Sequence, residues 1–502
     1  MGALADAVAR SFTAGEPERP AMSPLRALGR RRLSPIEVLG QSVATTAPAA
    51  SMVLLPVTMF THETWLPGLV TIAAATAVVM LIAHCVAQFT RRLAAAGGLY
   101  TFVFQGLGTR AALTCGAGLL AKYLGSGAIT LYHGGQAVLA LLAQFGIQPR
   151  GWGVAAVYFA VAVAIASVLV RGVRFAAAVI LAVEACSLIF IVGLLLAGAA
   201  GIDPPSPPAA PAGPGVLFVA MRALFGLAGF ESAACFAPET KRPLVTVTRT
   251  VLLTPLLCGA LFVFAGWAAC TGRADVLVSA YLHGTAGGVG PVVVILLNIG
   301  LTCSWLASSM ASSNAASRLV YSMGLEGVLP QVFTRIGARL RTPHLALAAI
   351  VGATTTGGLL YVAADGVPAS VGTAVRTALI TVYLLVAVAT VRFLRRIREM
   401  TRPDLYAGWI GAATLSATLG CLMVTQARDG TFAAAAAVAG VLAAGAAWHR
   451  YLSLVRPRSL RAIGVFDSPE SADVLPGAGV FAVNARGSIA LVGAQRGDPR
   501  EP

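Results

Sequence analysis

The sequence predicts an all-α polytopic membrane protein, and three observations lead to that fold class. Charged residues make up 11% of the 502 residues and hydrophobic residues 57%, whereas a soluble globular chain carries about 25% charged residues. The mean hydropathy is +0.80. Apolar runs close to the ~20 residues that cross a bilayer as a helix recur between residues 39 and 449. Since these runs lack the alternation of barrel strands, we expect helices.

Twelve transmembrane helices are expected, because twelve apolar runs are each long enough to span the membrane. The runs are 39–60, 67–88, 112–144, 152–170, 175–200, 215–236, 250–270, 290–317, 345–363, 374–392, 405–427 and 431–449. Segments on the side of the N-terminus hold 30 of the 36 lysines and arginines, and those on the opposite side hold 4. Because basic residues mark the cytoplasmic side, we expect both termini there. The frequent Ala, Gly and Arg residues are typical of bacteria and predict the cell (cytoplasmic) membrane as the location.

A proline-rich stretch, GIDPPSPPAAPAGP, occupies residues 201–214. It cannot form a helix, because proline lacks an N–H and disfavours the helical conformation in the residue before it. It divides the chain into two halves of five helices, which two further helices follow. The predicted organisation is a cytoplasmic N-terminal segment (1–35), a first five-helix repeat (36–200), an external loop (201–214), a second five-helix repeat (215–392), helices 11 and 12 (393–452) and a cytoplasmic tail (453–502).

Other function classes lack their signatures in this sequence. The net charge of +16 is spread over short clusters between the apolar runs, so we expect no nucleic-acid partner. The eight cysteines all fall inside apolar runs and form no CxxC pair, which favours core-filling residues over a metal site or a disulfide framework. HExxH, GxSxG and P-loop motifs are also missing from the sequence. We therefore expect no enzyme activity, no ATP hydrolysis and no cofactor.

The first and sixth predicted helices each carry an interruption. The first run contains Pro48 among small and hydroxyl residues, and the sixth contains Gly226 and Gly229, with Glu231 directly beyond. Backbone polar groups freed at mid-membrane depth are tolerated only where they line a cavity or are buried in protein. Interrupted helices at corresponding places of two halves therefore point to the binding site of a transporter. Simple kinking or close packing of the helices is the alternative.

Four stretches follow one another along the chain. They are GQSVATTAPAAS in the first helix, FTRRLAAAGGLYTFVFQGLG after the second, FGLAGFESAACFAPETKRP in and after the sixth, and NAASRLVYSMGLEGVLP after the eighth. Together they resemble permeases of the amino acid–polyamine–organocation superfamily, over about residues 33–452. The resemblance implies the LeuT-type fold, in which two inverted five-helix repeats move a substrate by alternating access.

The resemblance also implies a substrate site at the two interruptions. The implied substrate-binding residues are Thr45, Thr46, Ala47, Ala49, Ala50, Ser51, Phe225, Gly226, Gly229 and Phe230. Broken helix N-termini suit a substrate carboxylate, and freed carbonyls suit an ammonium. Ala49, Ala50 and Ser51 stand where many relatives have a G-S/A-G triplet. Phe225 stands where relatives place an aromatic gate, and the alternative is a core or lipid-facing side chain.

Charged residues inside the spans are further candidates, because a charge at mid-membrane depth is costly. Glu231 matches a glutamate that relatives use near the substrate or in proton coupling, with a structural acceptor between helices as the alternative. Lys122 is one of two lysines beside 34 arginines, and a desolvated lysine can lose its proton whereas an arginine effectively cannot. Glu184 lies at a similar depth. We expect Lys122 to pair with Glu184 or Glu231 in a coupling role, with a lysine that reaches the cytoplasmic surface as the alternative.

Three other polar residues are expected to have surface or structural roles. Arg222 is expected to reach the outer surface, and the alternative is that it attracts anionic substrate groups into a vestibule. His84 and His133 are expected to be packed and hydrogen-bonded rather than to relay protons.

The sequence therefore predicts a secondary active transporter for an amino acid or related organic amine, with protons as the candidate coupling ion. An exchanger of the same fold and a transporter-like membrane sensor are the alternatives. The few polar residues near the interruptions favour neutral amino acids ahead of cationic ones. The expected partners are this small-molecule substrate and the lipid bilayer.

Overall fold

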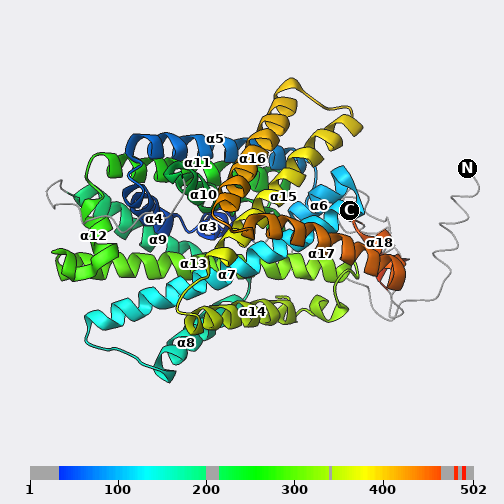
Figure 1. Cartoon of the computed structure of the whole chain (residues 1–502). Coiled ribbons are helices and arrows are strands. Elements are labelled where there is room, and N and C mark those ends of the chain that lie inside the picture. Colours follow the sequence, from blue (N-terminus) through cyan, green and yellow to red (C-terminus); the bar gives the residue numbers. More distant parts are fainter. Residues whose placement is uncertain (1–32, 199–213, 338–341, 465–479, 484–488, 493–502) are drawn as a thin grey trace, which may run out of the picture.

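The computed structural model describes residues 33–198, 214–337, 342–464, 480–483 and 489–492. Of the predicted segments, residues 1–32, the loop 201–213 and most of the tail beyond residue 464 lie outside the described residues. The described residues form a bundle of helices (Figure 1).

The helices can be followed in chain order from α3 to α18 (Figure 1). Before the gap at 199–213 lie α3 (Pro35–Thr45), α4 (Pro48–Thr61), α5 (Trp65–Thr90), α6 (Leu99–Leu107), α7 (Thr109–Gln144), α8 (Trp152–Val170) and α9 (Val173–Ala197). After it lie α10 (Gly215–Gly226), the 3₁₀ helix η1 (Phe230–Glu239), α11 (Pro243–Cys270), α12 (Asp275–His283), η2 (Gly284–Gly287), α13 (Pro291–Leu325), η3 (Gln331–Thr334), α14 (His344–Ala363) and α15 (Ala369–Arg396). The chain continues with α16 (Arg402–Arg428), α17 (Ala433–Val455) and α18 (Pro457–Ala462).

The tail adds a small sheet to the helical bundle. Two short strands, β1 (Val480–Val483) and β2 (Ile489–Val492), pair antiparallel, with Val480 opposite Val492. Among the other described residues, β-type pairing is limited to one isolated bridge between Leu33 and Thr240.

Ten segments of the described chain are long and apolar enough to cross a membrane. They are the interrupted segments Pro35–Thr61 and Gly215–Glu239 and the helices α5, α8, α9, α11, α13, α14, α15 and α16. The two other predicted spans are occupied by α7, a continuous helix of 36 residues, and by α17, a helix of 23 residues. The class of multi-pass helical membrane protein is therefore confirmed, and the number of twelve spans stays a prediction.

The elements occur in the same order before and after the gap at 199–213. Each part begins with an interrupted helix, continues with a long helix and a short one, and then has a helix of 35 or 36 residues. These longest helices, α7 and α13, pack against each other, and α8 lies beside α14 at one edge of the bundle (Figure 1). Two five-helix repeats require such a matching order.

Several helices extend beyond the predicted spans, and α13 shows the reason. The predicted span ends at residue 317, but α13 continues to Leu325. The part beyond residue 317 carries buried polar side chains, among them Arg318 and Ser322. Hydropathy detects the part of a helix that faces lipid, whereas a helix surrounded by protein can carry polar groups that find hydrogen-bond partners there.

The cysteines divide into buried and exposed groups. Cys85, Cys115, Cys235 and Cys258 are buried, Cys186 and Cys303 are intermediate, and Cys270 and Cys421 are exposed; all eight thiols are free. The prediction that every cysteine fills the core is therefore wrong for Cys270 and Cys421. A thiol behaves as a small hydrophobic group, so an apolar run in the sequence does not distinguish a core position from the outer face of a membrane helix.

The first interruption separates α3 from α4 at Thr46 and Ala47. Ala47 adopts a left-handed conformation, with φ 47° and ψ 58°, and Pro48 follows as the first residue of α4. A proline is favourable in the first turn of a helix but cannot continue the helix before it. The interruption predicted at Pro48 is therefore confirmed.

The second interruption separates α10 from η1. Gly229 has φ 146°, a conformation that only glycine adopts readily. A Cβ atom at this position would lie 2.9 Å from both Thr45 C and Thr46 N. The predicted interruption between Gly226 and Glu231 is thus confirmed, and the two interruptions touch each other.

A buried ion pair joins η1 to α13 at the end of the bundle where α3 begins. Arg318 Nε donates to Glu239 Oε2 at 3.2 Å and Nη2 donates to Oε1 at 3.3 Å. The two side chains are 2% and 1% exposed. Leu33 adds two backbone hydrogen bonds here, from its N–H to Glu239 O at 2.9 Å and from Lys241 N–H to its own carbonyl at 3.0 Å. These contacts join the start of α3, the end of η1 and α13.

Replacing Arg318 with methionine is expected to destabilise the protein, because the substitution removes a buried cation that pairs with Glu239. Removing one partner of a buried pair costs about 3–5 kcal/mol. The midpoint of thermal unfolding in detergent measures this loss of stability. Unfolding is detected by the chemical labelling of the four buried thiols. Glu399→Gln is the control, since Glu399 pairs with Arg92 at 2.6 Å but is 56% exposed, and exposed pairs contribute about 0–1 kcal/mol. Equal midpoints for the two variants would contradict the expectation.

Candidate functional site

A cavity of about 480 Å³ lies where the two interruptions meet. Its walls come from the α3–α4 interruption, from α7, from α10, from Trp305 and Ser308 of α13, and from the segment Gly366–Ala369 with the first two turns of α15. Small-molecule sites in proteins have volumes of ~300–1,000 Å³. The cavity is therefore large enough for an amino acid or a small amine.

Six of the ten predicted substrate-binding residues line this cavity: Thr45, Thr46, Ala47, Ser51, Phe225 and Gly226. The other four, Ala49, Ala50, Gly229 and Phe230, lie outside the lining. Ala49, Ala50 and Phe230 are completely buried, and Gly229 packs against the backbone of Thr45 and Thr46. These four residues support the wall of the cavity from behind.

Polar groups of the first interruption are bonded to neighbouring side chains. Ser308 Oγ donates to Thr45 O at 3.2 Å, and Ala50 N–H donates to Ser304 Oγ at 3.2 Å. Thr46 Oγ1 donates to Val43 O at 2.7 Å. Because hydroxyl groups can rotate and both donate and accept, these side chains satisfy the interruption and can still exchange partners with a bound molecule.

Lys122 and Glu231 form a buried ion pair beside the cavity. Lys122 Nζ lies 2.9 Å from Glu231 Oε1, and each side chain is 1% exposed. Glu231 Oε2 accepts hydrogen bonds from the Tyr383 hydroxyl and the Gly229 N–H, both at 2.8 Å. The predicted pairing of Lys122 with Glu231 is confirmed, and the alternative of a lysine that reaches the surface is wrong. The carboxylate joins η1 to α7 and α15.

Glu184 occupies a different place from that pair. Its Oε1 accepts a hydrogen bond from Ser304 Oγ at 3.2 Å, the hydroxyl that also accepts from the Ala50 N–H. Its Oε2 is buried without a hydrogen-bond partner among the described residues. The alternative pairing of Lys122 with Glu184 is therefore wrong, and Glu184 is linked through Ser304 to the first turn of α4.

Two arginines face the cavity from α10 and α15. Arg222 and Arg376 both belong to its lining and both are half-buried. Arg222 and Phe225 are three residues apart and share one face of α10, and the Arg376 guanidinium carbon lies 5.9 Å from the Phe225 ring centroid. Arg222 takes the position that the vestibule alternative requires, because its side chain lines the cavity.

The charge of Arg222 also acts on His62, which lies in the connection between α4 and α5. Burial and, second, the positive charge of Arg222 lower the pKa of the His62 imidazole below its usual range. The His62 ring stacks on Phe218, with centroids 4.6 Å apart and planes 8° from parallel. The neutral ring therefore predominates at neutral pH, and His62 adds no further positive charge near this side of the cavity.

His84 is hydrogen-bonded, and His133 is packed against an aromatic ring, as predicted for each. His84 Nε2 lies 2.8 Å from Asp404 Oδ1 and 3.1 Å from Gln88 Nε2. The His133 ring stacks on Trp305, with centroids 5.2 Å apart. His133 also borders the cavity, so it belongs to the site as part of the wall.

Three residues of the site are not among the sequence candidates. Tyr383 holds Glu231, Ser304 connects Glu184 to α4, and Arg376 lines the cavity. A signal for Arg376 did exist, since it falls inside the apolar run 374–392, where an arginine is costly and marks a functional place. Tyrosine and serine are common in membrane helices, so Tyr383 and Ser304 give no such signal.

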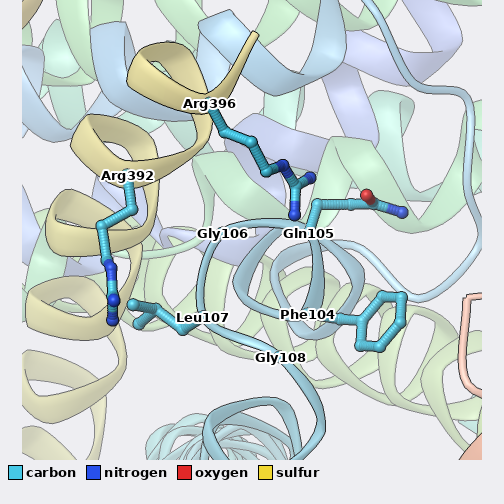
Figure 2. Close-up of a pocket in the computed structure, with 7 residues that line it drawn as sticks. All are labelled: Phe104, Gln105, Gly106, Leu107, Gly108, Arg392 and Arg396. Atoms are coloured by element: carbon cyan, nitrogen blue, oxygen red, sulfur yellow. The ribbon is translucent and has the colours of Figure 1, made fainter.

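A second pocket, of about 540 Å³, lies away from the interruptions. Figure 2 shows it between α15, which supplies Arg392 and Arg396, and residues 104–108 at the end of α6. It shares no residue with the cavity at the interruptions. Both arginines are exposed. They are among the basic residues from which the cytoplasmic side of the membrane is predicted.

The fold and the cavity together define a class of protein. A multi-pass helical bundle with an internal cavity where two interrupted helices meet is the architecture of a membrane transport protein. The described residues contain no group of three or more His, Cys, Asp or Glu that could hold a metal ion. Residues 41–443 match the family model described as amino acid permease, and the chain belongs to this family. Members of this family are transporters and not enzymes.

The chain is also similar to curated transporters at low identity. It is 26% identical over 343 residues to "Cationic amino acid transporter 4, vacuolar" and 22% identical over 292 residues to "Cationic amino acid transporter 2, vacuolar", both of Arabidopsis thaliana. It is 28% identical over 133 residues to "Low-affinity putrescine importer PlaP" of Escherichia coli strain K12. These matches cover 62%, 52% and 24% of this chain and 56%, 45% and 28% of the relatives. The matched regions thus span less than two thirds of each relative.

Proposed function

We propose that the chain is a secondary active transporter that moves an amino acid or related organic amine across the cell membrane. The observation that carries this proposal is the cavity at the two touching interruptions. The family match supports it, as do the names of the relatives, which are transporters of cationic amino acids or putrescine.

The proposed topology has twelve spans, with two inverted five-helix repeats followed by α16 and α17 and with both termini in the cytoplasm. Alternating access then requires the cavity to open first to one side and then to the other. In this proposal the buried Arg318–Glu239 pair blocks the way from the cavity on the side where α3 begins. In this proposal Phe225 closes over the substrate on the opposite side, and the Arg318–Glu239 pair separates when the substrate leaves.

We propose protons as the coupling ion, with Lys122, Glu231 and Glu184 as the coupling residues. Moving one proton onto Glu231 or off Lys122 removes the attraction that joins η1 to α7. Glu184 supplies a second buried carboxylate, and its connection through Ser304 reaches the first turn of α4. Ionisable groups at this depth are the usual sites of proton coupling in membrane transport.

Uptake by purified protein in liposomes tests the proposal. A pool of labelled amino acids and polyamines is offered with and without an inward proton gradient. We expect accumulation that the gradient increases and that Glu231→Gln removes, whereas Glu399→Gln, at an exposed position, retains it. Uptake that appears only with internal counter-substrate would instead indicate an exchanger, and binding without any flux would indicate a sensor.

A further inference from the structure

The cavity carries positive charge that the described protein groups do not balance. Its lining includes Lys122, Arg222 and Arg376, and no aspartate or glutamate belongs to the described lining. Glu231 neutralises Lys122. Neither Arg222 nor Arg376 forms an ion pair with a described residue. Asp365, next to the lining loop, is exposed to solvent, so two half-buried guanidinium groups remain for a ligand.

The N-terminus of α4 offers this cavity few free amides. Pro48 at the first position has no N–H, and the Ala50 N–H donates to Ser304 Oγ. Ala49 and Ala50 are both completely buried and lie outside the lining. A carboxylate that enters the cavity therefore meets the side chains of Arg222 and Arg376 rather than the helix end.

We propose that the substrate is an amino acid with an acidic side chain and that Arg222 and Arg376 bind its two carboxylates. This inference rests on the proposed function and specifies its substrate class. The planar guanidinium group binds a carboxylate through two parallel hydrogen bonds. Arg222 from α10 and Arg376 from α15 both line the cavity and provide one such partner for each carboxylate.

The charges also set an order among substrates. An acidic amino acid places two carboxylates against the two guanidinium groups, and the ammonium that it carries keeps access to the carbonyl groups of the interruptions. A neutral amino acid leaves one guanidinium without an anion. A cationic amino acid or a polyamine adds positive charge to a cavity that already has an excess, which is unfavourable in a partly desolvated site.

Competition in the liposome assay distinguishes these substrate classes. Labelled glutamate, aspartate, leucine and lysine are each offered alone, and uptake of labelled glutamate is then competed with unlabelled leucine, lysine, putrescine and succinate. We expect uptake of the acidic amino acids, weaker competition by leucine, and none by lysine or putrescine. Arg222→Met and Arg376→Met should each raise the half-maximal concentration of glutamate about tenfold or more, since a hydrogen bond to a charged group is worth about that factor.

Arg150→Met and Arg428→Met are the matched controls, because both arginines are exposed and lie outside the cavity; neither should change glutamate uptake. Uptake of leucine or lysine without uptake of glutamate would overturn the acidic substrate class and leave the proposed transporter intact. Preference for succinate over glutamate would overturn the assignment of an amino acid. Equal losses for leucine and glutamate in the Arg222 and Arg376 variants would overturn the role of the arginines as carboxylate ligands. Absence of flux for every compound would instead contradict the proposed function itself.

Discussion

Lys122→Met is expected to abolish proton-driven uptake, because Lys122 is a proposed coupling residue whose charge joins α7 to Glu231 of η1. The substitution also leaves the Glu231 carboxylate buried without its cation, which costs about 3–5 kcal/mol of folding stability. Initial rates of uptake in liposomes, corrected for the amount of folded protein, measure the loss.

The controls for this prediction separate a loss of transport from a loss of folding. Lys241→Met removes the other lysine of the chain, which is exposed, and should leave both uptake and stability unchanged. The double variant Lys122→Met with Glu231→Gln removes both charges, so we expect it to unfold at a higher temperature than Lys122→Met while it remains inactive. Normal uptake by either Lys122→Met or the double variant would show that the pair has no coupling role.

Gly229→Ala is expected to abolish uptake and to destabilise the protein. Alanine at φ 146° is strained by about 1–3 kcal/mol, and its Cβ would lie 2.9 Å from backbone atoms of Thr45 and Thr46. Overpacking of this kind costs about 1–3 kcal/mol more, because backbone atoms cannot move aside as a flexible side chain can. The unfolding midpoint in detergent and the uptake rate should both fall.

Gly352→Ala is the matched control for the glycine prediction. Gly352 lies inside α14, and a Cβ at this position would have no atom within 4 Å. Alanine is favoured over glycine in a helix by about 1 kcal/mol, so this variant should be as stable as the unmodified protein or slightly more so. Retained uptake in Gly229→Ala would contradict the close contact between the two interruptions.

The helical class and the places of the interruptions could be predicted from the sequence, because both depend on local chemistry. An apolar run must be helical in lipid, and Pro48 must end the helix that precedes it. The positive φ of Gly229 could not be predicted in the same way, since it reflects the approach of Thr45 and Thr46 from the other interruption. The end of α13 lies beyond its predicted span for a related reason, because its polar side chains find partners in distant parts of the chain.

The site shows the same division between local and distant effects. The cost of a buried charge predicted that Lys122 has a carboxylate partner, and the distance of 2.9 Å to Glu231 agrees. The choice between Glu231 and Glu184 depends on how η1 packs against α7, which depth along the helices does not determine. The basic side chain of Arg222 predicts a surface position. In the folded protein α15 contributes Arg376 and part of the wall to the cavity that Arg222 also lines.

The conformation of η1 has a consequence for how far its end can move. Its ten residues form a 3₁₀ helix, although 3₁₀ stretches longer than three or four residues are uncommon. A 3₁₀ helix rises about 2.0 Å per residue and an α-helix about 1.5 Å, so the same ten residues differ in length by roughly 5 Å between the two forms. Because Gly229 anchors one end of η1 against the first interruption, a change of helix type would displace the other end, with Glu239, along the helix axis without breaking the chain.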